Sequence, residues 1–135
     1  MAGYSGTPLA KKLGIKPGDS IALLAAPDGF ERLLDGLPDG VQLRTTARGT
    51  NAVIVSFHTQ RADLERRVPT LLGILEVNGG LWIAWPKKAS KVPADITEDT
   101  VREVCLPRGL VDVKVCAIDD TWSGLKLVWR KELRK

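Results

Sequence analysis

A chain of 135 residues, with 44% apolar residues, 27% charged residues and a net charge of +4, is long enough for one domain with a hydrophobic core. No apolar run is long enough to cross a bilayer, and the start "MAGYSGTPLAKK" does not resemble a signal peptide, so we expect a cytoplasmic protein. Cys105 and Cys116 lack a C-x-x-C spacing and the chain has one histidine, so we expect buried, reduced thiols and no metal site.

The net charge is concentrated at the C-terminal end. Five basic residues, set against Glu132 in the last ten positions, account for the whole +4, and the rest of the chain balances. A short basic end is more often a solubilising segment than a nucleic-acid-binding arm. The sequence's one indication of a nucleic-acid partner therefore comes from Lys126, Arg130, Lys131, Arg134 and Lys135.

In the first half of the chain, apolar runs of strand length alternate with helical segments, after eight residues that we expect to be loosely ordered. The runs "IALLAAP" and "NAVIVSF" are apolar throughout, as in strands buried on both faces. The expected elements are, in order, a helical turn at 8–14, a strand at 21–27, a helix at 28–38, a short polar strand near a sheet edge at 40–47 and a strand at 51–57.

A longer helix is expected next. Apolar residues recur at helical spacing from Leu64 to Leu75, and Thr59 is the expected N-cap. Pro69 interrupts the pattern because it lacks an N–H donor, so we expect a kink or a second helix there.

The remaining segments complete an α/β pattern. They are a strand at 79–86, a capped helix at 95–107 and two antiparallel strands at 109–118 and 121–131. Continuous apolar strands separated by helices indicate a parallel sheet covered on both faces. The predicted fold is a single Rossmann-like domain over 1–135: a doubly wound, mostly parallel sheet of about six strands with a C-terminal antiparallel hairpin strand.

Ligands of open α/β sheets bind at the carboxyl ends of the strands. The predicted strands place four segments there, at 26–30, 56–60, 85–90 and 119–124. The ligand-binding residues expected at this edge are Pro27, Asp28, Gly29, His58, Trp85, Lys87, Lys88, Ser90, Asp119 and Trp122.

The charged residues at this edge have two interpretations. Lys87 and Lys88 either hold a phosphate or carboxylate group, or they are solvated or paired with Asp119 and Asp120. The two aspartates themselves follow the pattern of turn residues, since they open the hairpin turn "DDT".

The other edge residues are also ambiguous. His58 or Asp28 would be the base of an enzyme, although a single histidine after a strand is more often a surface or capping residue. Trp85 and Trp122 either stack on a flat ligand or pack against the sheet. The "PDG" turn at 27–29 offers backbone N–H groups to an anion but is not a Gly-rich loop.

The order of elements resembles that of the class I S-adenosylmethionine-dependent methyltransferases, including the reversed last strand. That family carries a Gly-rich loop after its first strand and, at the end of its second, an acidic residue that binds ribose hydroxyls. Here "AAPDGF" contains only Gly29, and the second strand ends in Arg44, Thr45 and Thr46. No "NPPY"-like stretch follows the third strand. The resemblance implies the fold. Because most of the family's cofactor-binding pattern is missing here, we expect that the chain binds no cofactor, and S-adenosylmethionine is the less favoured alternative.

Almost the whole chain also looks like a bacterial family known only as domain of unknown function 3052. That resemblance implies a small cytosolic bacterial protein and supplies no activity and no catalytic residue. The stretches that carry it are "YSGTPLAKKLGIKPG", "LWIAWPKKASKV", "DITEDTVREV" and "GLVDVKVCAIDDTWSGLKLVWRK".

We therefore predict a non-enzymatic protein that binds a small anionic ligand or a protein partner at the carboxyl edge. Lys87, Lys88 and Ser90 would contact the anion between Trp85 and Trp122. The alternatives are a reduced methyltransferase-like enzyme, a nucleic-acid-associated protein using its basic C-terminal residues, and an oligomer whose subunits pair through an edge strand "WSGLKLVW".

Overall fold

The computed structural model describes residues 8–34 and 36–134. Residues 1–7, expected to be loosely ordered, and Lys135 of the basic end lie outside the described residues. The strands are β1 (Ser20–Leu24), β2 (Gln42–Arg44), β3 (Asn51–Phe57), β4 (Leu75–Pro86), β5 (Leu110–Ala117) and β6 (Trp122–Trp129). They form one sheet in the order β2-β1-β3-β4-β6-β5, in which only β6 runs antiparallel to its neighbours. The predicted α/β fold with a C-terminal hairpin is confirmed.

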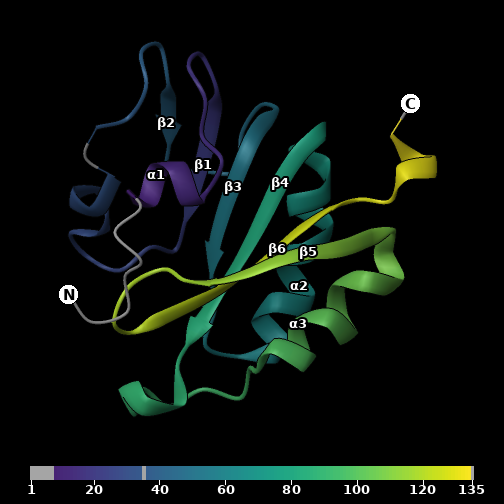
Figure 1. Cartoon of the computed structure of the whole chain (residues 1–135). Coiled ribbons are helices and arrows are strands. Elements are labelled where there is room, and N and C mark those ends of the chain that lie inside the picture. Colours follow the sequence, from purple (N-terminus) through teal and green to yellow (C-terminus); the bar gives the residue numbers. More distant parts are fainter. Residues whose placement is uncertain (1–7, 35, 135) are drawn as a thin grey trace.

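Helices lie on both faces of this sheet. The α-helices are α1 (Leu9–Lys12), α2 (Arg61–Gly73) and α3 (Glu98–Cys105), and the 3₁₀ helices are η1 (Phe30–Leu34), η2 (Lys88–Ser90), η3 (Leu106–Arg108) and η4 (Lys131–Leu133). Figure 1 shows α1 on one face of the sheet and α2 and α3 on the other. Among the described helices, none combines the length and the apolar character needed to cross a bilayer.

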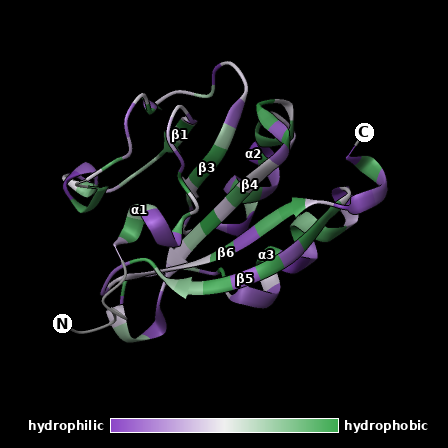
Figure 2. Ribbon diagram, turned by 45° about the horizontal axis from the view of Figure 1, so that its top comes forward, coloured by the Kyte–Doolittle hydropathy of each residue, from purple (hydrophilic) through white to green (hydrophobic). Residues whose placement is uncertain are grey.

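The strand residues divide between two cores by simple alternation. Val53 and Val55 of β3 pack with α1 and η1, whereas Ile54 between them packs with α2 and α3. Successive side chains of a strand point to opposite faces, so a strand in the middle of the sheet must be apolar throughout. In Figure 2 strand β3 is mostly green, whereas helices α2 and α3 carry both colours.

The second helix differs from its prediction in three ways. Its N-cap is Gln60 and not Thr59, it is one helix and not two at Pro69, and Leu75 belongs to β4 and not to the helix. The helix tolerates the lost backbone hydrogen bond because apolar side chains on its inner face are fully buried on both sides of the proline. The helix ends early because the backbone after it joins the sheet, where Leu75 is paired with Asn51 of β3.

The C-terminal hairpin is attached to the sheet in an order that the sequence does not reveal. Strand β6 pairs with both β4 and β5, so β5 is the edge strand at the hairpin end of the sheet. The segment "WSGLKLVW", predicted to be an edge strand, is therefore an interior strand. Helix α3 is fixed to the hairpin by Arg102, whose Nε donates a 2.9 Å hydrogen bond to Asp112 of β5. The most exposed valine of β5 is Val113, at 55%.

The two cysteines are free thiols in different environments. Cys105 is buried as predicted, whereas Cys116 is only half-buried. Burial raises the pKa of the Cys105 thiol to about 12, so this side chain behaves as an apolar core residue.

Candidate functional site

The four predicted strand-end segments meet at the carboxyl edge of the sheet. The backbone N–H of Lys87 donates a 2.7 Å hydrogen bond to the carbonyl of Thr121, which joins the end of β4 to the hairpin turn. The backbone N–H of His58 donates a 2.9 Å hydrogen bond to the carbonyl of Ala84, which joins the end of β3 to β4. The topology therefore brings these loops together through backbone contacts.

An aromatic cluster connects the segments on the α1 face. The ring of Phe57, at the end of β3, lies between the rings of Phe30 of η1 and Trp122 of β6 and contacts both edge-on. The distance between ring centroids is 4.8 Å to Phe30 and 5.0 Å to Trp122. Edge-to-face contacts add about 0.5–1.5 kcal/mol each beyond area burial. Trp122, which we expected to form a wall for a ligand, is half-buried and packs against Phe57.

A buried polar network lies on the other side of β3. His58 contacts Ser56 Oγ through Nε2 and Asp63 Oδ2 through Nδ1, each at 2.7 Å. Burial lowers the pKa of His58 and the charge of Arg67 adds to this, against the opposing effect of Asp63. The neutral ring therefore donates from Nδ1 to the Asp63 carboxylate and accepts the Ser56 hydroxyl at Nε2.

This network is structural and not catalytic. It has the Ser-His-Asp order of a hydrolase triad, but Ser56 is fully buried and His58 is 2% exposed, so a substrate reaches neither. A triad histidine also uses both ring nitrogens, so it is burial alone that keeps a substrate from His58 and argues against His58 as the base of an enzyme. Asp63 lies in the first turn of α2, so the network fixes the start of that helix to β3.

We expect stability to fall in mild acid because of His58. The pKa of His58 is lowered on folding, so below the unfolded value of about 6.5 the unfolded chain binds a proton that the native chain does not. The contribution of His58 to the free energy of unfolding is therefore constant above about pH 6.5 and decreases by at most about 1.4 kcal/mol per pH unit below it, until the native imidazole protonates.

Because His58 is the single histidine of the chain, proton NMR of its ring follows this titration without assignment. Urea unfolding at pH 5, 6 and 7 measures the stability. A native ring that titrates at or above pH 6.5 would contradict the neutral, buried network, and His58→Gln is expected to remove the pH dependence in this range.

The lysines after β4 do not pair with the hairpin aspartates. Asp119 Oδ1 accepts hydrogen bonds from the backbone N–H groups of Thr121 at 2.8 Å and Trp122 at 2.7 Å, which is turn chemistry. In the part of the chain that the structure describes, neither Lys87 nor Lys88 forms an ion pair. Lys88 is exposed and Lys87 is half-buried, so both ammonium groups are available to a ligand.

Two other predicted site residues have local roles. Trp85 is 7% exposed and packs in the core with α2 and α3, so it does not line the edge. The Ser90 hydroxyl donates a 2.6 Å hydrogen bond to the carbonyl of Lys87 and accepts one from the backbone N–H of Val92 at 3.2 Å. Ser90 therefore shapes the loop that carries the lysines.

The turn after β1 has a conformation that the sequence does not reveal. Ala25 is left-handed, with φ of 57°, and Gly29 has φ of 77°. The carbonyl of Pro27 accepts a 3.1 Å hydrogen bond from the N–H of Phe30, which starts η1. Among the described contacts, the N–H groups of Asp28 and Gly29 donate no hydrogen bond, and Asp28 is exposed. The turn therefore presents free donors and a carboxylate at the edge.

The end of β2 lacks such groups. Arg44 donates hydrogen bonds to the side chains of Asn51 at 3.2 Å and Gln42 at 3.3 Å. Both partners lie at the first residues of their strands, so the guanidinium is turned away from the carboxyl edge. Only Thr45 and Thr46, both exposed, follow there.

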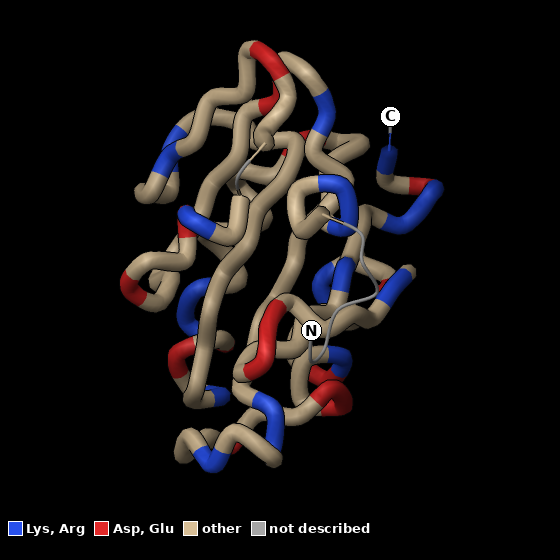
Figure 3. The backbone as a smooth tube through the Cα atoms, turned by 60° about the vertical axis from the view of Figure 1, so that its left-hand side comes forward, with Lys and Arg blue, Asp and Glu red and all other residues tan. Residues whose placement is uncertain are grey.

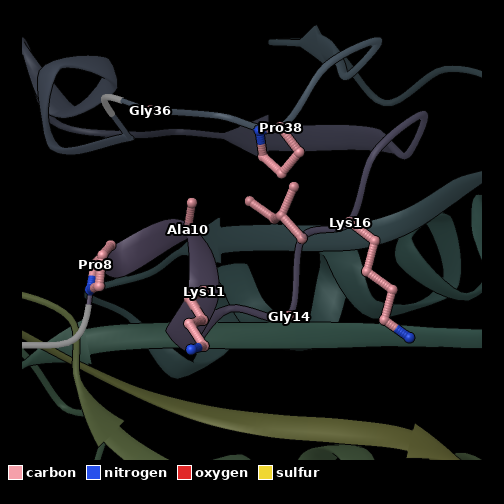
Figure 4. Close-up of a pocket in the computed structure, with 8 residues that line it drawn as sticks. Pro8, Ala10, Lys11, Gly14, Lys16, Gly36 and Pro38 are labelled. Atoms are coloured by element: carbon pink, nitrogen blue, oxygen red, sulfur yellow. The ribbon is translucent and has the colours of Figure 1, made fainter.

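Three hollows of the described surface are lined by residues other than the predicted ligand-binding residues. One of about 390 Å³ lies between α1 and the segment before β2, with Ala10, Ile15 and Pro38 in its walls (Figure 4). A second, of about 370 Å³, lies on the outer surface of α2. The third, of about 270 Å³, lies beside Lys126 of β6. Within residues 8–34 and 36–134, no group of three or more His, Cys, Asp or Glu side chains is placed to hold a metal ion.

The fold recurs among solved methyltransferase structures. A putative type 11 methyltransferase from Sulfolobus solfataricus matches with a TM-score of 0.67 and 12% identity, over 97% of this chain and 95% of that one. The magnesium protoporphyrin IX methyltransferase of Synechocystis PCC 6803 with bound S-adenosylmethionine matches with a TM-score of 0.62 and 10% identity, over 90% and 74%. The ribosomal protein L11 methylase of Lactobacillus delbrueckii subsp. bulgaricus matches with a TM-score of 0.59 and 13% identity, over 90% and 75%. The chain shares the methyltransferase fold.

These findings correct three predictions. No family model and no curated protein sequence matches the chain, so membership of the family of unknown function 3052 is not supported. The non-enzymatic binding protein is contradicted, because methyltransferases recur among the similar structures and favour the methyltransferase-like alternative. The expectation of no cofactor is contradicted too, because the Synechocystis enzyme was solved both with bound S-adenosylmethionine and with bound SAH.

Proposed function

We propose that this chain binds S-adenosylmethionine at the carboxyl edge of its sheet and acts, as one domain, as a small methyltransferase. The observation that carries the proposal is the turn after β1, in which the left-handed Ala25 is followed by backbone N–H groups without acceptors. Such groups bind the polar parts of a ligand without a side chain. The position of this turn, at the first strand of a methyltransferase fold, supports the assignment.

The residues that follow β1 fit S-adenosylmethionine, whereas those that follow β2 do not. The turn after β1 supplies donors and conformation, but the end of β2 lacks the acidic residue that the family uses for ribose hydroxyls. Asp28, in the turn after the neighbouring strand β1, offers an exposed carboxylate instead. We assign to Asp28 the role of accepting hydrogen bonds from these hydroxyls.

The substrate would bind beside the lysines. S-adenosylmethionine, when bound, supplies an electrophilic methyl group, so the chain's own task is to hold an acceptor atom near it. Lys87 and Lys88 lie on the loop after β4, within the same edge, and carry charges that no described carboxylate neutralises. They suit a substrate that bears a carboxylate or phosphate group.

Isothermal titration with S-adenosylmethionine tests the cofactor site through a pair of variants at Ala25. Ala25→Val is expected to weaken binding by at least about tenfold, because a β-branched residue does not adopt φ of 57° without strain. Ala25→Gly, which adopts this conformation readily, is expected to bind like the wild type. No binding by the wild-type chain, or equal binding by all three proteins, would contradict the proposal.

Asp28→Asn separates two roles of that carboxylate, with the exposed Asp39→Asn as a control on a turn at the other end of the strands. Weaker cofactor binding in Asp28→Asn alone supports contact with the ribose. Unchanged binding would overturn the assignment of Asp28, and if methyl transfer were then lost Asp28 would be the base.

A further inference from the structure

A second group of lysines lies away from the carboxyl edge, beside the hollow of about 270 Å³. This hollow is formed by the turn between α1 and β1, the first half of β4 and Lys126 of β6. Its walls include Asp19, just before β1, and Ala52, near the start of β3. It therefore sits toward the amino ends of the parallel strands, away from the proposed cofactor site.

Lys126 is placed directly opposite Lys114 in the antiparallel ladder of β5 and β6. Like charges in directly opposed positions destabilise a sheet. Lys16, in the turn before β1, is the third member of the group and lines the same hollow as Lys126. Burial lowers the pKa of Lys126, and the charges of Lys114 and Lys16 lower it further. Three cations are thus held close enough to oppose one another.

Two glycines leave room for the Lys126 side chain beside the hollow. A Cβ atom at Gly80 of β4 would lie 2.7 Å from Lys126 Cε, and one at Gly14 would lie 3.4 Å from its Nζ. The aliphatic part of the lysine therefore lies close to the backbone at Gly80. In Figure 4 the Lys16 side chain extends away from Ala10 and Pro38, the apolar walls of the neighbouring hollow.

No described carboxylate forms an ion pair with these lysines, although two carboxylates line the same hollow. Asp19 keeps its negative charge in the lining, where its Oδ2 accepts a 2.8 Å hydrogen bond from the backbone N–H of Lys16. Glu76 also lines the hollow and forms no ion pair in the described part of the chain. Figure 3 shows basic and acidic residues spread over the whole length of the described backbone.

We propose that this hollow binds a phosphate group, with Lys126 and Lys16 contacting its oxygens and Lys114 adding charge. With Lys114, the three ammonium groups outnumber the two carboxylates of the hollow, so a phosphate group balances the remaining positive charge, and lysine binds it as a point charge. The site is independent of the proposed cofactor site. Its ligand is either a small phosphorylated compound or the phosphodiester backbone of a nucleic acid, and the experiment separates the two.

The test uses two probes: pyrophosphate in isothermal titration, and a fluorescein-labelled single-stranded RNA of ten nucleotides in anisotropy. Lys126→Gln is expected to weaken binding of the active probe by at least about tenfold, as for loss of one charge-assisted contact. The control is Lys131→Gln, in the basic C-terminal end, which is expected to bind like the wild type. Pyrophosphate binding identifies a small phosphate ligand, and RNA binding without pyrophosphate binding identifies a phosphodiester.

The variant Lys114→Glu provides a second, independent test of the proposed phosphate site. It replaces a repulsive cross-strand pair by an attractive one, so it is expected to raise Tm while it weakens probe binding. The proposal is overturned if neither probe binds, if Lys126→Gln and Lys114→Glu both bind normally, or if only Lys131→Gln loses binding. S-adenosylmethionine titrated into Lys126→Gln is expected to bind as in the wild type, so this proposal and the proposed function fail separately.

Discussion

Trp82→Ala is expected to lower the free energy of unfolding by about 3–5 kcal/mol, a large part of the total stability of a domain of this size. Trp82 is fully buried in β4 at the centre of the sheet, among the largest side chains of the α1-face core. Its Nε1 also donates a 3.2 Å hydrogen bond to the carbonyl of Leu13, which follows α1. The substitution therefore opens a cavity and leaves a buried carbonyl without its donor.

Urea unfolding followed by far-UV circular dichroism measures this loss without relying on tryptophan fluorescence. Trp82→Phe keeps most of the packing but loses the N–H donor, so it is expected to cost about 1–2 kcal/mol. The matched control is Trp129→Ala, because Trp129 is half-exposed at the end of β6. A loss in Trp82→Ala no larger than that in Trp129→Ala would show that the core tolerates the cavity.

Phe57→Ala is expected to cost a similar amount, about 3–5 kcal/mol, and also to weaken S-adenosylmethionine binding by at least about tenfold. The ring of Phe57 supports Phe30, which begins η1 directly after the turn of the proposed cofactor site. It also supports Trp122 at the start of β6. Removal of the ring leaves both neighbours without their edge-on contacts, so the turn after β1 loses its support.

Phe57→Leu is the matched variant, because it keeps an apolar side chain and loses only the ring geometry. It is expected to retain measurable cofactor binding and most of the stability. Both properties are measured at a temperature where circular dichroism shows each variant to be folded. Normal cofactor affinity in folded Phe57→Ala would mean that the aromatic cluster does not position the turn.

The element boundaries show where local patterns were insufficient. The strand "NAVIVSF" was predictable because a strand buried on both faces must be apolar at every position. The boundary between α2 and β4 was not, because Leu75 fits both the helical spacing and the start of a strand. Pro69 does not divide α2 into two helices, since burial of the helix on its inner face outweighs one missing backbone hydrogen bond.

The sequence alone determined the α/β fold and the edge at which four strand-end segments meet, because apolar runs and connection handedness constrain topology strongly. Only the tertiary structure decided what individual side chains do there. His58 was expected at the edge, yet its burial and its bonds to Ser56 and Asp63 depend on helix α2 docking on β3. The partners of a side chain are set by elements distant in sequence.

The same reason explains the features that sequence reasoning missed. Ala25 adopts a left-handed conformation that usually requires glycine, so the sequence does not indicate it. The surrounding fold imposes this conformation. Lys114 and Lys126 face each other only because a register shift between Asp112 and Lys114 moves one strand by a residue. Residue types are written in the sequence, but register, burial and charge proximity arise only when the strands pair.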